Sequence, residues 1–213
     1  MKTLLTGFVC LCAAAVSPAA LIFNNGTPDT SQADAWGIAA SRLADDFSLG
    51  GPATLSAIRF WMVSVAGEFA GTLSYAVYQD AAGALGSVVG SGTVNVSPVF
   101  LNQIPQFVQR YYQVDFNLPA PLALGAGTYW LELHNGSDLT NSSSAQVLWG
   151  VVAGDPPGNA KLGLSAQLPS SNTFDALAFQ LYSADTAPVP EPSTLGICGI
   201  GLVALGLFRR ASL

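Results

Sequence analysis

Residues 128–134 read Thr-Tyr-Trp-Leu-Glu-Leu-His, with an aromatic or aliphatic side chain at every odd-numbered position. Successive side chains of a β-strand point to opposite faces, so this alternation predicts a strand whose odd-numbered side chains face a core. Three side chains are then expected to face outward: Trp130, Glu132 and His134. Gly-Ala-Gly before the stretch and Asn-Gly after it are typical of turns between antiparallel strands.

The same period-two pattern recurs along most of the chain. It predicts further strands at residues 57–65, 72–79, 93–99, 111–118, 145–152 and 177–182, and edge strands at 20–23 and 43–49. Gly-rich and Pro-rich segments separate them, and we interpret residues 83–92 as such a turn region. Only residues 31–43 suggest a short helix. The pattern therefore predicts an all-β fold, an antiparallel β-sandwich that is jelly-roll-like.

The first nineteen residues have the three parts of a secretory signal peptide. Lys2 supplies the positive charge, and residues 4–16 form an apolar core. The small side chains of Ser17 and Ala19 precede the expected cleavage point before Ala20. Signal peptidase is therefore an expected partner, and an uncleaved N-terminal anchor is the alternative.

The last part of the chain joins a stiff spacer, an apolar run and two cations. Residues 188–192 read Pro-Val-Pro-Glu-Pro, residues 195–208 are all apolar, and Arg209 and Arg210 follow. Fourteen residues of helix span about 21 Å, against a hydrocarbon core of about 30 Å. We expect a single C-terminal transmembrane helix, with the Arg pair in the cytoplasm and the rest of the chain outside. A buried core helix or an interfacial segment is the alternative.

This C-terminal order resembles the PEP-CTERM sorting signal over residues 189–210. The residues that carry the resemblance are Val189, Pro190, Glu191, Pro192, Arg209 and Arg210. It implies a Gram-negative bacterial protein that is exported and processed by an exosortase, with the helix as a temporary anchor and the Arg pair as a stop signal. It further implies an inner-membrane-anchored intermediate, followed by the cell surface or the extracellular matrix of biofilm and exopolysaccharide.

Three segments follow from these signals: a signal peptide at 1–19, an exported domain at 20–187 and a sorting signal at 188–213. The cysteines Cys10, Cys12 and Cys198 all lie outside the exported domain, which therefore forms no disulfide. That domain holds four Lys and Arg residues against twelve Asp and Glu, a net charge of −8. Such an acidic surface argues against nucleic acid and against a polybasic hold on lipid, since both need clustered cations.

Catalytic signatures are sparse. His134 is the only histidine, and the chain contains neither Gly-x-Ser-x-Gly nor His-Glu-x-x-His. Glu68 and Glu132 are candidate glycosidase carboxyls, but the sequence does not pair them, and we interpret His134 as an exposed residue at a strand end. We therefore predict no enzyme activity and a structural or interaction role, with a glycan hydrolase as a distant alternative.

Two features support binding hypotheses. Asp45 and Asp46 carry the oxygen ligands that Ca²⁺ prefers, although neighbours on a strand point to opposite faces, and the alternative is that both are solvated or hydrogen-bonded. No other cofactor is expected. Trp130, on the outward register, suits stacking on a sugar ring, which makes a lectin-like carbohydrate-binding module for extracellular polysaccharide the main alternative function. The competing interpretation places Trp130 in the core, as we expect for Trp61 and Trp149.

Overall fold

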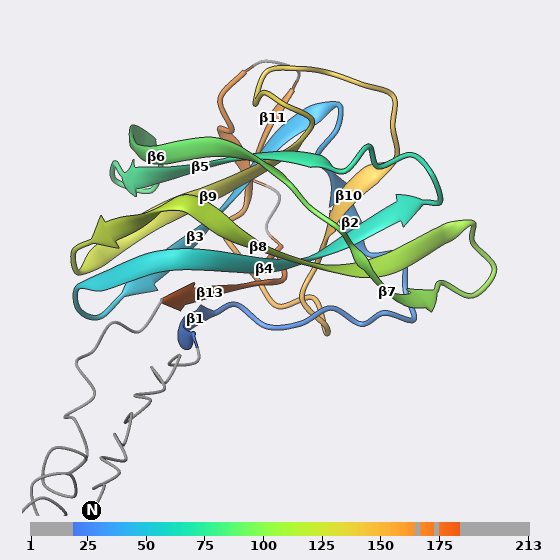
Figure 1. Cartoon of the computed structure of the whole chain (residues 1–213), viewed down its shortest axis with the longest axis horizontal. Helices are drawn as coiled ribbons and strands as arrows, with labels where there is room; N and C mark the ends of the chain where they lie inside the picture. Colours follow the sequence, from blue (N-terminus) through green and yellow to red (C-terminus); the bar gives the residue numbers. More distant parts are fainter. Residues whose placement is uncertain (1–18, 165–166, 173–174, 184–213) are drawn as a thin grey trace, which may run out of the picture. The chain divides into compact units, whose positions relative to one another are not determined.

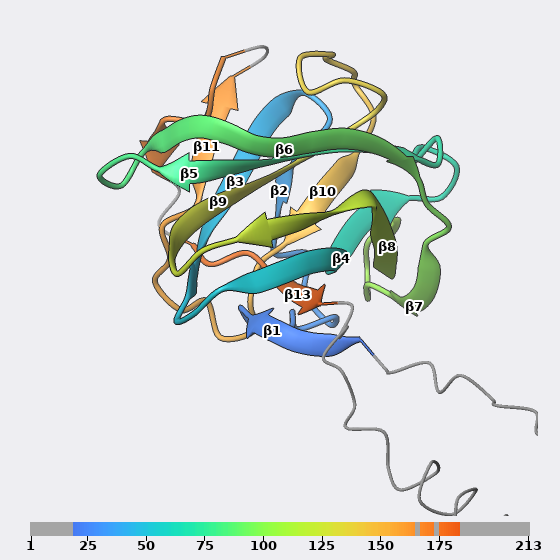
Figure 2. The same cartoon turned by 60° about the vertical axis from the view of Figure 1, so that its left-hand side comes forward.

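The computed structural model describes residues 19–164, 167–172 and 175–183, and every regular element in these ranges is a β-strand. Two antiparallel sheets form a sandwich-like fold, as Figures 1 and 2 show. The predicted all-β antiparallel sandwich is therefore confirmed, whereas jelly-roll connectivity stays a prediction. Within the described ranges there is no helix with the length and apolarity needed to cross a membrane.

Several predicted features lie outside the described residues. They are the signal peptide through Pro18 and the whole segment 188–213, with the sorting motif, the expected membrane helix and the Arg pair. Ala20, the residue after the expected signal cleavage, is described and is the first residue of strand β1 (Ala20–Asn24).

The first sheet is organised around the long strand β4 (Ala53–Val65). One edge of β4 pairs with β8 (Gln109–Leu124), which pairs in turn with β7 (Val99–Gln103). The other edge of β4 is shared between β13 (Phe179–Ser183) and β10 (Val147–Gly150). Two edge strands end these branches: β1 next to β13, and β2 (Ala35–Gly37) next to β10.

The second sheet has the predicted strand at its centre. Its order is β12 (Ser171–Asn172), β11 (Lys161–Leu164), β3 (Ser41–Leu49), β9 (Gly127–Asn135), β5 (Thr72–Asp80) and β6 (Leu85–Asn95). Strand β9 pairs with β3 on one edge and with β5 on the other, so the strand expected at residues 128–134 is confirmed. Its odd-numbered side chains are buried in the main core, as the alternation predicted.

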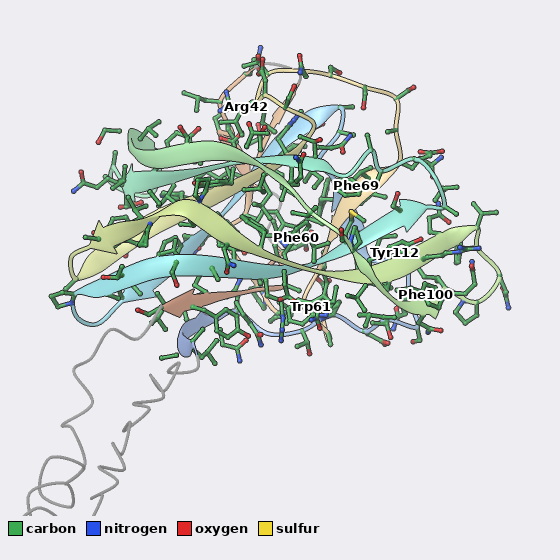
Figure 3. All side chains as sticks on the ribbon, viewed as in Figure 1. Arg42, Phe60, Trp61, Phe69, Phe100 and Tyr112 are labelled. Atoms are coloured by element: carbon green, nitrogen blue, oxygen red, sulfur yellow. The ribbon has the colours of Figure 1, made fainter. Side chains whose placement is uncertain are left out.

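The main core lies between the sheets. Phe60, which Figure 3 labels near the middle of the molecule, packs edge-on against Trp149 with ring centroids 6.1 Å apart, and Trp149 packs against Phe179 at 5.7 Å. The predicted burial of Trp61 and Trp149 is confirmed. The rings of Phe60, Trp149 and Phe179 all belong to the first sheet, and Phe179 also packs against Phe47 of β3 in the second sheet, with ring centroids 6.5 Å apart. Fully burying a side chain such as Phe contributes about 1.5–3 kcal/mol, so contacts of this kind hold the two sheets together.

Two local predictions around the first strands are wrong. Residues 31–43 form no helix, because Trp36 of β2 pairs with Trp149 of β10 in the sheet. Strand pairing and burial override the weak helix propensity of that stretch. Residues 43–49 form a strand as predicted, but not an edge strand, since β3 has β9 on one side and β11 on the other.

The Gly-rich stretch at 83–92 is also more regular than predicted. Most of it belongs to β6, whose single strand partner in the described part of the chain is β5. A Cβ atom at Gly90 would lie 3.0 Å from Leu122, and one at Gly92 would lie 3.0 Å from the ring of Tyr75. These glycines therefore serve close packing along an edge strand rather than a turn.

Candidate functional site

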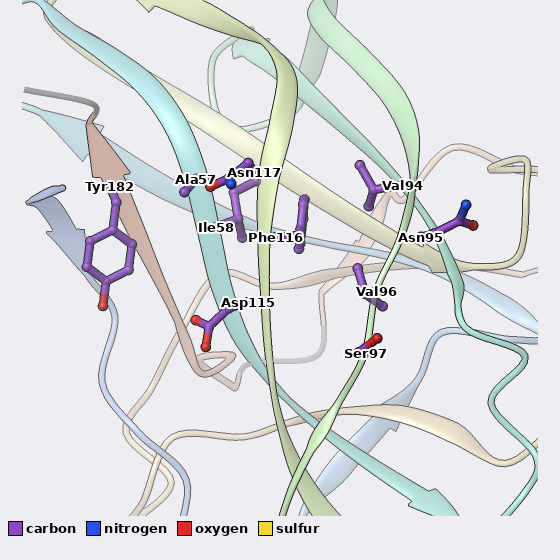
Figure 4. Close-up of a pocket in the computed structure, with 10 residues that line it drawn as sticks. All are labelled: Ala57, Ile58, Val94, Asn95, Val96, Ser97, Asp115, Phe116, Asn117 and Tyr182. Atoms are coloured by element: carbon purple, nitrogen blue, oxygen red, sulfur yellow. The ribbon is translucent and has the colours of Figure 1, made fainter. Parts of the chain in front are cut away.

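An open hollow of about 530 Å³ lies over β4 and β8 and beside the segment that joins β6 to β7 (Figure 4). We call it the trough. Its lining combines amide, hydroxyl, carboxylate, aromatic and aliphatic groups from four segments of the chain: Ala57, Ile58, Val94, Asn95, Val96, Ser97, Asp115, Phe116, Asn117 and Tyr182.

The trough exists because β8 is much longer than β7. Strand β7 covers only residues 110–113 of β8, so the rest of β8 has a strand partner on one edge alone among the described residues. Residues 96–98 carry the chain from β6 in the second sheet to β7 in the first, and they border the uncovered edge. The pleat of β8 then turns Phe116 toward the core and leaves Asp115 and Asn117 exposed.

An ion pair and an aromatic ring flank the trough. Arg59 Nε donates to Asp115 Oδ1 at 2.6 Å, and Gln113 Nε2 donates to Asp115 Oδ2 at 2.6 Å. The Arg59 guanidinium also lies 5.7 Å from the centroid of the Tyr182 ring, and the Tyr182 hydroxyl donates to Gln180 Oε1 at 2.6 Å. The hydrogen bond to Asp115 raises the pKa of Arg59. The polar groups are therefore held in place while they stay in contact with solvent.

Chemically, this arrangement suits a hydroxyl-rich ligand. Asp115, Asn117, Asn95 and Ser97 offer hydrogen-bond donors and acceptors, and Tyr182 offers an aromatic ring. An open trough whose lining mixes polar and apolar side chains fits an extended chain better than a small molecule, which prefers an enclosed and mostly apolar pocket.

The structure confirms the interpretation in which Trp130 is buried and contradicts the one in which its ring is exposed to a sugar. Its side chain is 2% exposed, its Nε1 donates to Asp80 Oδ1 at 2.8 Å, and Lys161 Nζ lies 5.2 Å from its ring centroid. The predicted outward register is correct, but the outer face of the second sheet is covered there. A small apolar cluster packs around the ring: Ala44, Ala76, Tyr78, Leu85 and Leu139. A sugar ring has no free indole face to contact at this position.

The neighbouring outward side chains are buried as well. Glu132 is fully buried and accepts hydrogen bonds from Arg42 Nε at 2.5 Å, Arg42 Nη2 at 2.8 Å and the Tyr78 hydroxyl at 2.6 Å. His134 is 1% exposed, so its interpretation as an exposed strand-end residue is wrong. Neither of its ring nitrogens has a hydrogen-bond partner within the described ranges, and burial lowers its pKa.

Asp45 and Asp46 point to opposite faces of β3, as the strand geometry predicted. Asp45 is buried and accepts hydrogen bonds from Asn25 Nδ2 at 2.9 Å, Leu177 N at 2.8 Å and Asp46 N at 2.9 Å. Burial raises the pKa of Asp45 to about 7. In the part of the chain that the structure describes, no three His, Cys, Asp or Glu residues are grouped to hold a metal ion. Calcium binding by this pair stays a prediction.

Sequence reasoning did not single out the trough. The alternation of β8 placed Asp115 and Asn117 on an outward face correctly, but that signal is shared by many surface residues. The lining comes from segments up to 125 positions apart, from Ala57 to Tyr182. Only the folded arrangement shows that they border one hollow.

Comparison with known proteins identifies the C-terminal segment. Residues 188–210 match the model of the PEP-CTERM protein-sorting motif. No curated protein and no solved structure matches the chain. The motif implies export, processing by an exosortase and membrane-associated sorting to the cell surface. The chain therefore carries a PEP-CTERM protein-sorting signal in its C-terminal segment.

Proposed function

We propose that this exported protein has a non-catalytic interaction role in the extracellular matrix, and that its sandwich contacts polysaccharide through the trough. The observation that carries the proposal is the trough itself, where Asp115, Asn117 and Tyr182 line one hollow of about 530 Å³. The sorting motif supports the location, because an exosortase substrate reaches the surface where polysaccharide is found.

The net negative charge of the domain favours uncharged polysaccharides over acidic ones as ligands. Residues 20–187 carry a net charge of −8, and the ordinary consequence of such a field is repulsion of anions. Asp115 adds a local carboxylate, although Arg59 neutralises it through the hydrogen bond at 2.6 Å. We therefore expect an uncharged polysaccharide to bind better than an acidic one.

A non-catalytic role is supported by the positions and bonding partners of the candidate catalytic carboxyl groups. Retaining and inverting glycosidases both need two carboxyl groups around the scissile bond, but Asp115 is the one carboxyl among the described lining residues of the trough. Glu132 is buried in its ion pair with Arg42, and Glu68 accepts a hydrogen bond from the Gln146 N–H. Neither is placed to face a polysaccharide with a second acid.

The test compares two identical substitutions of exposed asparagines. The full chain, purified in mild detergent, is titrated with a soluble neutral glucan and with an acidic exopolysaccharide. We expect Asn117→Ala in the trough to weaken glucan binding at least fivefold, and Asn141→Ala in the loop after β9 to leave it unchanged. Equal binding by both variants, or turnover of the glucan by the wild-type chain, would contradict the proposal.

A further inference from the structure

The hairpin formed by β7 and the start of β8 carries an exposed apolar surface. Five large apolar side chains there are 40–68% exposed, and we call them the hairpin patch: Val99, Phe100, Leu101, Phe107 and Val108. Figure 3 shows Phe100 at one end of the sandwich beside Tyr112, and the two rings are 6.0 Å apart. Exposed apolar side chains concentrated in one short hairpin indicate an interaction site, whereas single ones scattered over a surface do not.

The hairpin patch lies in a long stretch without charge. No Asp, Glu, Lys or Arg occurs between Asp80 and Arg110. Of the nine large apolar side chains that are exposed among the described residues, seven fall in this stretch. Two copies of a domain with a net charge of −8 repel one another over most of their surfaces, but not where both present this uncharged patch.

The tip of the hairpin is rigidly built. Gln103 Nε2 donates to Phe107 O at 2.6 Å and to Gln109 O at 3.0 Å, and Ile104 N donates to Gln109 O at 3.1 Å. Ile104 is fully buried, and Gln106 takes a left-handed conformation with φ of 66°. These contacts hold Phe107 in solvent, so little conformational freedom is lost when a partner binds there.

Strand β7 also leaves a sheet edge open. It pairs with β8 alone within the described part of the chain, and it contains no charged residue to block a further strand. A second copy related by a two-fold axis beside this strand would place its own β7 against the open edge, which is the arrangement that a symmetric dimer requires.

We propose that the hairpin patch binds a second copy of this chain. An uncharged apolar surface offers nothing to a strongly basic or acidic partner, whereas it matches itself in charge and chemistry. Exosortase sorting delivers copies to the same surface, which raises their local concentration. This surface is distinct in residues from the trough, so the proposal does not depend on polysaccharide binding.

A photo-crosslinking experiment on the full chain tests this in a Gram-negative host with an exosortase. The probe is Phe107→p-benzoylphenylalanine, and the control carries the same probe at Leu21, which is 52% exposed on β1. We expect an adduct of twice the chain mass at position 107, at least fivefold more abundant than at position 21. An equal yield at both positions overturns the proposal, as does an adduct with lipid in place of a second chain.

The second part of the experiment introduces a charged residue into the hairpin patch and measures the crosslinked adduct again. Phe100→Asp is expected to reduce the adduct at least fivefold, whereas Val88→Asp on β6 leaves it unchanged. Phe100 packs on Tyr112, so its replacement could also disturb folding. A second variant therefore carries the charge as Phe107→Asp, with the probe moved to Val108. Resistance to trypsin checks that both variants are folded. An adduct that persists at full yield in both folded variants overturns the proposal.

Discussion

Among the described residues, an arginine–carboxylate ion pair joins neighbouring strands in each sheet, and the two pairs lie in opposite surroundings. Arg42 and Glu132 are 2.5 Å apart with side chains 8% and 0% exposed, whereas Arg59 and Asp115 are 2.6 Å apart with side chains 33% and 47% exposed. Both arginines have a tyrosine beside them, Tyr78 in the first case and Tyr182 in the second. The same chemistry therefore serves the interior of the fold in one sheet and a surface in the other.

The two ion pairs differ in whether other segments of the chain pack over the sheet face on which they lie. Leu85 and Leu139 pack over the cluster beside Glu132, so the charges there are removed from water and must satisfy one another. Beside Asp115 the β6–β7 segment borders the face without closing it. Removing a charge from each pair in turn measures how far this difference governs stability and binding.

The largest effect is expected from Glu132→Gln. The substitution leaves the buried Arg42 guanidinium without its carboxylate, and breaking a buried pair in this way costs about 3–5 kcal/mol. Chemical denaturation of the full chain in mild detergent measures the free energy of unfolding. A loss below about 1 kcal/mol would mean that the covered face admits water and that the two pairs are alike.

A smaller effect on the free energy of unfolding is expected from pH, through the buried side chain of His134. Burial lowers the folded-state pKa of His134 below its usual 6.5, so the unfolded chain binds a proton that the folded chain does not. The free energy of unfolding therefore decreases as pH falls below about 6.5, by at most about 1.4 kcal/mol per pH unit, and is fully retained above it.

The measurement for this prediction is the difference between wild type and His134→Gln between pH 7.5 and pH 5.5. Asp45 acts in the opposite direction, because its pKa is raised to about 7 and its contribution to stability falls as pH rises from about 4 to 7. That contribution is common to both proteins and cancels in the difference. A difference that does not vary with pH would show that His134 is not held away from water.

The smallest effect on stability is expected from Asp115→Asn. Exposed ion pairs contribute about 0–1 kcal/mol, so the free energy of unfolding should change by no more than that. Binding of the neutral glucan should nevertheless weaken severalfold, because the substitution removes an acceptor at the trough and releases Arg59. If stability falls as far as in Glu132→Gln, the open face is part of the structural framework rather than a contact surface.

The sequence alternation correctly predicted which face of the sheet each side chain of β9 points to, but it did not predict which of these faces are buried. It placed Trp130, Glu132 and His134 on one face and the odd-numbered side chains of β9 on the other, as the structure has them. Leu85 and Leu139, which lie outside β9, pack on the cluster that contains Trp130. Glu132 is bonded to Arg42 of β3 and Tyr78 of β5. A period-two pattern contains no information about such segments, and this is why the exposure of His134 was predicted wrongly.

The trough could not be predicted from the sequence either, because its lining comes from segments that are far apart in the chain. Arg59 and Asp115 are 56 positions apart, and nothing in either local sequence indicates the other. The sorting signal, by contrast, is a continuous segment, so the resemblance seen at residues 189–210 could be confirmed by the match at 188–210. Continuous signals are accessible from sequence, whereas a surface assembled by strand pairing is not.

The pairing of the first strand with the last sets an order for folding during export. Ala20 of β1 lies opposite Ser183 of β13, and β13 stands between β1 and β4. A chain that crosses the membrane from its N-terminus delivers β1 first, yet among the described strands β1 pairs with β13 alone. Contacts between such distant segments form late, since the whole intervening loop must close. The first sheet is thus completed only when the residues just before the sorting signal emerge, which ties the end of folding to the start of sorting.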